Sequence, residues 1–252
     1  MNALQRGMKL AVIDPRMSHI AEKAHTWVPI KPGTDAAFAF GMARWIIENN
    51  RYDARYLQNP NKEAAALDKE PTWSDATFLV AISEKGKPKL RAKVLGIGTE
   101  DQFVVIENGQ TVPADKAVEG QLEVDMLING IQVKSAFTLF KERVMEKAIE
   151  EYAKICEVKP QQIIELAQEF TSYGKKASIT AYRGPAMRVN GYYNIRAINM
   201  LNHLIGNYDW KGGSISAGGN FKPLEGRYML NEVLNVHKAW GIPLTREKSV
   251  YE

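Results

Sequence analysis

The sequence of 252 residues predicts an α/β fold, a mostly parallel sheet with flanking helices of the dinucleotide-binding kind plus an antiparallel β insertion. Two short apolar runs, at residues 9–14 and 177–181, each precede a polar turn and a helical period, as βα units do. Between them, residues 78–137 follow the strand period and carry two Asn-Gly pairs. The pattern divides the chain into a first βα unit (1–77), the β insertion (78–137), a helical connection (138–176) and a second βα unit with an irregular glycine-rich tail (177–252).

The first unit opens with a run of branched apolar residues, which is typical of a buried parallel strand. We expect it to stop at Asp14, because Pro15 cannot donate to a sheet and keeps the preceding residue extended. Residues 35–50 then have the period of an amphipathic helix, whose first amides Thr34 or Asp35 is expected to cap. The apolar face of this helix contains Phe38, Met42, Trp45 and Ile46.

The middle of the chain changes from polar connection to strands. Residues 51–75 are polar and interrupted by prolines, and we expect a surface connection with one helical turn. Asn108-Gly109 and Asn129-Gly130 lie between apolar-alternating arms. Because both central residues of a tight hairpin turn need a positive φ, Asn-Gly pairs predict two antiparallel hairpins.

Helices and a second βα unit follow the insertion. Residues 138–155 and 160–170 are predicted helices, and Pro160 suits a first helical position, where its missing amide costs nothing. Residues 177–181 are expected to form a strand, residues 182–184 a turn, and residues 190–205 a helix. That helix is expected to end at Gly206-Asn207, where a left-handed residue is tolerated. The glycine-rich tail shows no clear period between residues 211 and 226.

Composition excludes several classes of protein. The 33 basic and 29 acidic residues give a net charge of +4, which is too small to indicate nucleic-acid binding. No apolar run approaches the roughly 18 residues that a membrane-spanning helix needs. The single cysteine, Cys156, excludes an internal disulfide, a four-cysteine iron–sulfur site and a cysteine-based zinc site within this chain, and we expect a structural thiol. No histidines have metal-ligand spacing, so no metal site is predicted, and His25 and His203 are expected to serve packing.

Residues at the carboxyl end of the first predicted strand could bind a nucleotide. In open α/β sheets, ligands bind at this edge and phosphates bind at helix amino termini. Asp14 could accept from a ribose hydroxyl or a guanine edge, Arg16 could bind a phosphate, and residues 33–35 offer amides, a hydroxyl and a carboxylate. The alternative is structural: Asp14-Pro15 breaks a strand and Thr34-Asp35 caps a helix. These residue types alone support the two interpretations equally.

A family resemblance favours the first interpretation. Asp14-Pro15-Arg16 and residues 24–36, followed later by residues 179–184 and 197–207 with Gly212-Gly213, resemble the conserved blocks of the molybdopterin oxidoreductases, the dimethyl sulfoxide reductase superfamily. Within that superfamily the chain looks most like an interior portion of the tetrathionate reductase large subunit, with thiosulfate and polysulfide reductases as close neighbours. The finer resemblance depends on residues 72–80, the β insertion, residues 226–228 and Tyr251-Glu252.

The resemblance implies a cofactor and its contacts. The family binds bis(molybdopterin guanine dinucleotide) with molybdenum or tungsten, and the matching positions imply contacts to the guanine dinucleotide and, later in the chain, to the pterin end and the substrate channel. The implied contacts to the guanine dinucleotide are Asp14, Arg16, Ser18, Gly33, Thr34 and Asp35, and those near the pterin are Arg183, Gly184 and Met187. Arg183 is the candidate for steering an anionic sulfur substrate, because a guanidinium matches an oxyanion in charge and geometry. A phosphate clamp or a structural ion pair is its alternative role.

The resemblance also implies the wider setting. The parent reaction would be two-electron reductive cleavage of a sulfur–sulfur bond in a small sulfur oxyanion. The partners would be a membrane anchor subunit plus an iron–sulfur electron-transfer subunit, at the outer face of the cytoplasmic membrane, and a 4Fe-4S cluster would belong to the full-length subunit rather than to this chain. We therefore expect an interior piece of a larger subunit without reductase activity of its own. A stand-alone nucleotide-binding module and an excised structural domain without ligand affinity are the alternatives.

Overall fold

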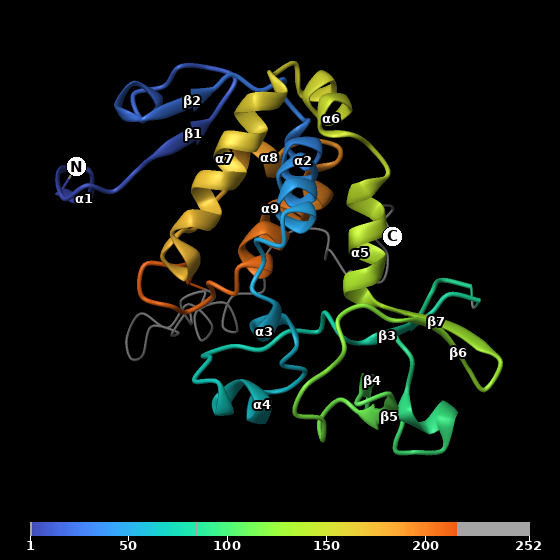
Figure 1. Ribbon diagram of the computed structural model, residues 1–252. Helices are drawn as coiled ribbons and strands as arrows, with labels where there is room; N and C mark the ends of the chain where they lie inside the picture. Colours follow the sequence, from blue (N-terminus) through green and yellow to red (C-terminus); the bar gives the residue numbers. More distant parts are fainter. Residues whose placement is uncertain (1, 84, 216–252) are drawn as a thin grey trace, which may run out of the picture. The chain divides into compact units, whose positions relative to one another are not determined.

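The computed structural model describes residues 2–83 and 85–215 of the chain (Figure 1). The chain divides into two units, Met1–Ser216 and Ala217–Glu252, and all that follows concerns the described part of the first unit. Residues 226–228, Tyr251-Glu252 and most of the predicted glycine-rich tail lie outside the described residues.

One long helix organises the main core. The helix α2 (Asp35–Glu48) packs against four others (Figure 1), which are α5 (Ala136–Met145), α6 (Ile149–Cys156), α7 (Pro160–Ser172) and α9 (Gly191–Leu204). The predicted apolar face is confirmed: Phe38, Met42 and Ile46 are buried and Trp45 is half-buried. Gly41 lets α7 approach closely, because a Cβ there would lie 3.1 Å from Cγ2 of Ile163.

The predicted helix of residues 138–155 is two helices, α5 and α6, separated at residues 146–148. Arg44 explains the interruption, because its Nη1 donates to the carbonyls of Met145 (3.1 Å) and Lys147 (2.7 Å). Ala148 is extended and begins α6 with its amide bonded to Glu151 Oε2 at 2.9 Å. The next helix, α7, starts at Pro160 as predicted.

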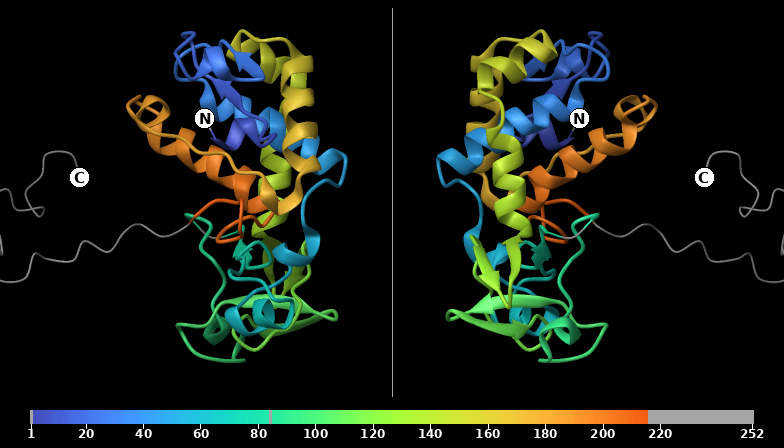
Figure 2. Two further views of the ribbon diagram at one scale, coloured as in Figure 1. Left: turned by 90° about the vertical axis from the view of Figure 1, so that its left-hand side faces the viewer. Right: turned by 90° about the vertical axis from the view of Figure 1, so that its right-hand side faces the viewer.

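The β insertion contains both predicted hairpins, which are confirmed. The strands are β3 (Leu79–Ala81), β4 (Val104–Glu107), β5 (Gln110–Pro113), β6 (Asp125–Ile128) and β7 (Ile131–Ser135). Three of them pair antiparallel in the order β3-β7-β6, and a second hairpin pairs β4 with β5. Asn108, Gly109, Asn129 and Gly130 have φ values of 49°, 77°, 49° and 81°, as these turns require. The hairpins gather at the amino-terminal end of α5, which follows β7 directly (Figure 2). The 3-10 helix η2 (Ala92–Leu95) lies between β3 and β4 in the chain.

The connection at residues 51–75 was expected on the surface, and that prediction is wrong. It forms two short helices, α3 (Ala54–Leu57) and α4 (Lys62–Leu67), and Tyr56 and Leu57 are fully buried. The ring of Tyr56 lies against the end of α9, where a Cβ on Gly206 would approach its Cγ to 2.4 Å. Gly206 has a φ of 59° and ends the helix as predicted.

The prediction of a mostly parallel sheet is wrong for the residues that the structure describes. Parallel pairing of named strands is limited there to β1 (Ala11–Ile13) with β2 (Thr26–Val28), and β1 is largely exposed where a buried strand was expected. Residues 177–181 form no strand, and side chains from α9 and from the turn after it bind their backbone instead. Asn202 accepts from the Ile179 amide at 2.9 Å and donates to its carbonyl at 2.7 Å, as a neighbouring strand would.

The remaining short elements are α1 (Asn2–Gln5), η1 (Ala21–Lys23), η3 (Gly174–Lys176) and α8 (Arg183–Ala186). The predicted turn at residues 182–184 is thus the beginning of a single helical turn. Residues 187–190 connect this turn to α9, and hydrogen bonds from Asn190 and Asn194 join the start of α9 to the start of α2.

Candidate functional site

The loop after β1 holds the first three predicted site residues. The carboxylate of Asp14 accepts from the Arg16 amide at 2.8 Å, and the Asp14 carbonyl accepts from Trp27 Nε1 at 2.9 Å. The Ser18 hydroxyl accepts from the Ala21 amide at 3.4 Å at the start of η1. Asp14 and Ser18 therefore shape the loop, as the structural alternative expected of Asp14, and the Arg16 side chain is left exposed to solvent.

The start of α2 holds the next three. Gly33 has a φ of 82°, and Thr34 precedes the helix. The predicted side-chain cap is wrong, since the Thr34 hydroxyl donates to the Lys31 carbonyl at 2.7 Å. The Ala36 amide is instead bound by Asn194 Oδ1 of α9 at 3.2 Å. The Asn194 side chain, which comes from another helix, thus makes the capping hydrogen bond that was expected of Thr34 or Asp35.

Asp35 presents a half-buried carboxylate beside this contact. Its Oδ2 accepts from Asn194 Nδ2 at 3.4 Å. Burial raises the pKa of Asp35 above its ordinary value, while its own backbone amide and the guanidinium of Arg188 act in the opposite direction. The start of α2 therefore offers a hydrogen-bond acceptor with a basic neighbour, rather than a row of free amides.

The short helix α8 and the turn after it hold Arg183, Gly184 and Met187, all exposed to solvent. The Arg183 guanidinium lies 5.4 Å from the ring centre of Tyr182, and a Cβ on Gly184 would meet open space. Among the residues that the structure describes, Arg183 has no ion-pair partner, so the alternative of a structural ion pair finds no support there. The same stretch of chain carries several exposed apolar side chains, namely Tyr182, Met187, Val189, Tyr192 and Tyr193.

Two of the three predicted segments come together. Asn190 Nδ2 donates to the Gly33 carbonyl at 3.0 Å, and Asn194 Nδ2 donates to the Pro185 carbonyl at 3.2 Å as well as to Asp35. Residues 33–36 and 183–187 therefore share one face of the molecule. Within residues 2–83 and 85–215, no hydrogen bond joins the Asp14–Ser18 loop to either of them.

Sequence reasoning missed Asn190, Asn194 and Arg188. Asn190 was used only as the start of a helix, and Asn194 lies one turn later on the packed side of that helix, where it is fully buried. Asn190 is the exposed residue just before the helix, and Asn194 lies at i+4 from it on the packed face, where an amide without partners would be costly. That spacing was the available signal.

The lone thiol belongs to this region as well. Cys156 is fully buried, as a structural thiol should be, and burial raises its pKa to about 11. Its Sγ donates to the Thr34 carbonyl at 3.5 Å. Cys156 therefore packs beneath the predicted cofactor loop at residues 33–35.

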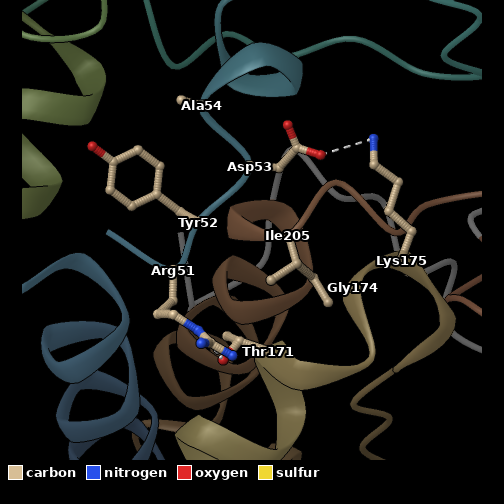
Figure 3. A pocket seen from close by; sticks show the side chains of 8 residues that line it. All are labelled: Arg51, Tyr52, Asp53, Ala54, Thr171, Gly174, Lys175 and Ile205. Carbon is tan, nitrogen blue, oxygen red and sulfur yellow. Dashed lines mark hydrogen bonds and ion pairs between the residues drawn. The ribbon is translucent and has the colours of Figure 1, made fainter. Parts of the chain in front are cut away.

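A pocket lies at the opposite end of α9 (Figure 3). It is an open depression of about 360 Å³ lined by Arg51, Tyr52, Asp53, Ala54, Thr171, Gly174, Lys175 and Ile205. Lys175 points toward Asp53, 3.1 Å from its Oδ2, and also pairs with Glu70. No predicted site residue lines it, and its half-buried cation, Lys175, is already neutralised by two carboxylates.

In residues 2–83 and 85–215, no three His, Cys, Asp or Glu side chains cluster in a way that could hold a metal ion. No helix in that part of the chain has the length and apolar character to cross a membrane.

Comparisons with known proteins agree with the resemblance seen in the sequence. The family profile described as molybdopterin oxidoreductase matches residues 1–240. A selenate reductase subunit from Mesobacillus selenatarsenatis is 46% identical, over 97% of this chain and 24% of that protein. A tetrathionate reductase subunit from Salmonella typhimurium is 33% identical, over 99% of this chain and 26% of that protein. Among solved structures, acetylene hydratase from Pelobacter acetylenicus aligns with a TM-score of 0.47 at 24% identity, covering 82% of this chain and 18% of that one. The chain thus spans about a quarter of the length of these curated relatives.

Proposed function

Because the chain belongs to the molybdopterin oxidoreductase family, and the relatives named above include two reductases, we propose that it forms the guanine-dinucleotide-binding portion of an oxyanion reductase catalytic subunit. The enzyme is the full-length subunit. The role of this portion is to bind and orient a molybdopterin guanine dinucleotide.

One observation carries the proposal. The two segments that resemble the family's cofactor blocks, residues 33–36 and 183–187, are joined through Asn194, and the carboxylate of Asp35 lies at the junction. A carboxylate accepts hydrogen bonds only, and the Watson–Crick edge of guanine presents the N1–H and 2-amino donors side by side. Asp35 therefore has the chemistry to select guanine over adenine.

The surrounding groups fit an anionic ligand. Arg16, Arg183 and Arg188 are exposed, and their guanidinium groups match phosphate and oxyanion oxygens. Arg16 and Arg188 would bind pyrophosphate, and Arg183 would bind substrate or the pterin end, with Gly184 leaving room and Met187 adding apolar contact. When bound, the cofactor supplies two-electron chemistry at molybdenum or tungsten. The protein groups named here position it and attract the substrate.

The substrate class proposed is a dianionic oxyanion of sulfur or selenium. The sequence alone favoured tetrathionate, with thiosulfate or polysulfide as the alternative. The higher identity to a protein named selenate reductase, 46% against 33%, makes selenate a second candidate. Arg183 suits either, because a guanidinium recognises the terminal oxygens common to both anions.

The wider assembly is also part of the proposal. Both reductase relatives are named as one subunit of their enzyme, which implies further subunits. We infer two partners, a membrane anchor and an iron–sulfur electron-transfer subunit, with the complex at the outer face of the membrane. A 4Fe-4S cluster would lie elsewhere in the full-length catalytic subunit.

Calorimetric titration of the 252-residue chain tests the nucleotide proposal directly. We expect guanosine diphosphate to bind and adenosine diphosphate to bind about tenfold more weakly or not at all, since one charged hydrogen bond contributes about 1.5–3 kcal/mol. Inosine diphosphate, which lacks the 2-amino group, should fall between them. Asp35→Asn should remove the preference for guanine. Equal affinity for the guanine and adenine nucleotides would contradict the proposal, and no binding at all would favour the structural domain without ligand affinity.

A further inference from the structure

We propose that Asn190 and Asn194 are positioning residues, an amide pair at the start of α9 that fixes the guanine-selecting carboxylate of Asp35 against the α8 turn. This inference rests on the proposed function for its ligand, but its structural part concerns the chain alone. Neither residue belongs to the segments that the family resemblance marked as ligand contacts.

Asn194 uses its whole hydrogen-bonding capacity within the protein. Its Oδ1 accepts from the Ala36 amide at 3.2 Å and from Asn190 Nδ2 at 3.1 Å. Its Nδ2 donates to the Pro185 carbonyl at 3.2 Å and to Asp35 Oδ2 at 3.4 Å. Because the side chain is fully buried, each of these bonds replaces one that water would otherwise make. The amide therefore holds the carboxylate of Asp35 in one place relative to α8.

Asn190 supports this arrangement from one turn earlier. Its amide donates to the Gly33 carbonyl at 3.0 Å, and a Cβ built on Gly33 would lie 4.0 Å from its Oδ1. Gly191 lets the start of α9 approach the end of α8 closely, since a Cβ there would come within 1.9 Å of the Ala186 carbonyl oxygen. The α8 turn, the start of α9 and the start of α2 are thus locked together before any ligand arrives.

The chemistry requires an amide at position 194. A leucine would leave the Ala36 amide and the Pro185 carbonyl buried without partners, which is unfavourable for folding. An aspartate would keep the acceptor for Ala36 but place a second carboxylate against Asp35. The other titratable groups facing Asp35 are the guanidinium of Arg188 and the thiol of Cys156. Only the guanidinium can offset an added negative charge.

The first test uses the chain without ligand. In Asn194→Asp, two carboxyl groups would face each other, and such a pair retains one proton to a pH well above the ordinary carboxyl range. Carboxyl carbon NMR should show Asp35 titrating with this pair, at least one pH unit higher than in the unsubstituted chain. An unchanged titration of Asp35 would overturn the inference. Asn190→Ala, a change at an exposed residue that folding tolerates, should speed hydrogen exchange of the first amides of α2.

Asn61 provides a matched control. It is also a buried asparagine that joins separate segments, accepting from the Ala64 amide at 2.8 Å and donating to the carbonyls of Ala114 and Ala117 at 2.7 Å. Asn61→Asp makes the same chemical change at a site whose bonds all lie in α4 and the β insertion. It should lower stability while leaving the titration of Asp35 unchanged.

The second test adds guanosine diphosphate. Asn194→Asp should weaken its binding about tenfold near pH 6 and move the pH dependence of binding upward, because guanine needs the ionised carboxylate, whereas Asn61→Asp should change neither. Wild-type affinity and wild-type pH dependence in Asn194→Asp would overturn the inference. If the unsubstituted chain binds no guanosine diphosphate while Asp35 still responds to Asn194→Asp, the proposed function fails and the positioning role stands.

Discussion

The two ends of α9 are held in place by different groups, and their charges are balanced to different degrees. At the carboxyl-terminal end, Lys175 lies between Asp53 and Glu70 and over the rings of Tyr56 and Trp210, so its charge is fully matched. At the amino-terminal end, amides hold the loops in place, and the guanidinium groups of Arg183 and Arg188 have no ion-pair partner among the residues that the structure describes. The concave surface is at the first end and the unmatched charge is at the second. Concavity alone points to the first end, whereas the nucleotide site that we propose lies at the second.

The difference indicates that the rigid part of the molecule and the proposed binding site lie at opposite ends of one helix. Ion pairs, aromatic rings and a tightly fitted glycine stabilise the carboxyl-terminal end. The amino-terminal end is held by neutral amides, which fix the loops without consuming the charges that an anionic ligand needs. Substitutions at the first end should therefore change stability and spare nucleotide binding, and substitutions of the exposed arginines at the second should change binding and spare stability.

The largest effect is expected at Gly206. Its φ of 59° disfavours any side chain, and a Cβ would overlap the Tyr56 ring at 2.4 Å. Gly206→Ala should lower the free energy of unfolding by about 3 kcal/mol or more, as strain and overpacking combine. Urea denaturation measures it. Gly174→Ala is the matched control, since Gly174 has a φ of 53° with nothing within 4 Å, and strain alone should cost about 1–2 kcal/mol. Equal losses in the two variants would refute the close packing of Tyr56.

The sequence predicted the local elements at both ends of α9 and missed the hydrogen bonds that join distant segments there. Periodicity placed α2, α7 and α9, and Asn-Gly pairs placed the hairpins, because these depend on neighbours along the chain. Residues 177–181 have the composition of a strand, yet Asn202 from a distant helix turn pairs with their backbone. The contact between Asp35 and Asn194 likewise spans 159 positions. Such tertiary partners leave no local periodic pattern, so the two loops were predicted and their junction was not.

The next effect concerns Arg183, at the amino-terminal end of α9, where we propose binding. In the full-length catalytic subunit, Arg183→Gln should raise the KM for the oxyanion about 10–100-fold and change kcat less, since a charge-assisted contact made in the bound state is lost. Comparing selenate with tetrathionate in this variant would show which anion depends on the guanidinium. Arg91→Gln is the control, because that guanidinium lies 3.9 Å above the Phe103 ring, in the β insertion. An unchanged KM for both anions would remove Arg183 from the substrate path.

A smaller effect is expected from His203 at the stabilising end. Its Nε2 lies 2.9 Å from the Ser74 hydroxyl, and burial lowers its pKa from 6.5 despite the nearby carboxylate of Asp75. The folded state thus binds its proton less readily than the unfolded state, so stability is complete above pH 6.5 and falls below it by up to about 1.4 kcal/mol per pH unit until the folded pKa is reached. Denaturation between about pH 7 and 5 should show this slope, and His203→Gln should flatten it. A slope that persists in the variant would assign it to other groups.

The smallest effect is expected at Cys156, which tests whether closeness to the binding end implies a role in it. The thiol is fully buried beneath Thr34, and burial raises its pKa to about 11, so almost no thiolate is present at neutral pH. Native chain should react with a thiol reagent only as fast as it opens, and quickly in denaturant. Cys156→Ala should cost about 1 kcal/mol or less and leave guanosine diphosphate binding unchanged, because the carbonyl of Thr34 loses only a weak donor. If guanosine diphosphate binding fell in proportion to the labelling of Cys156, the residues packed beneath Thr34 would belong to the binding site.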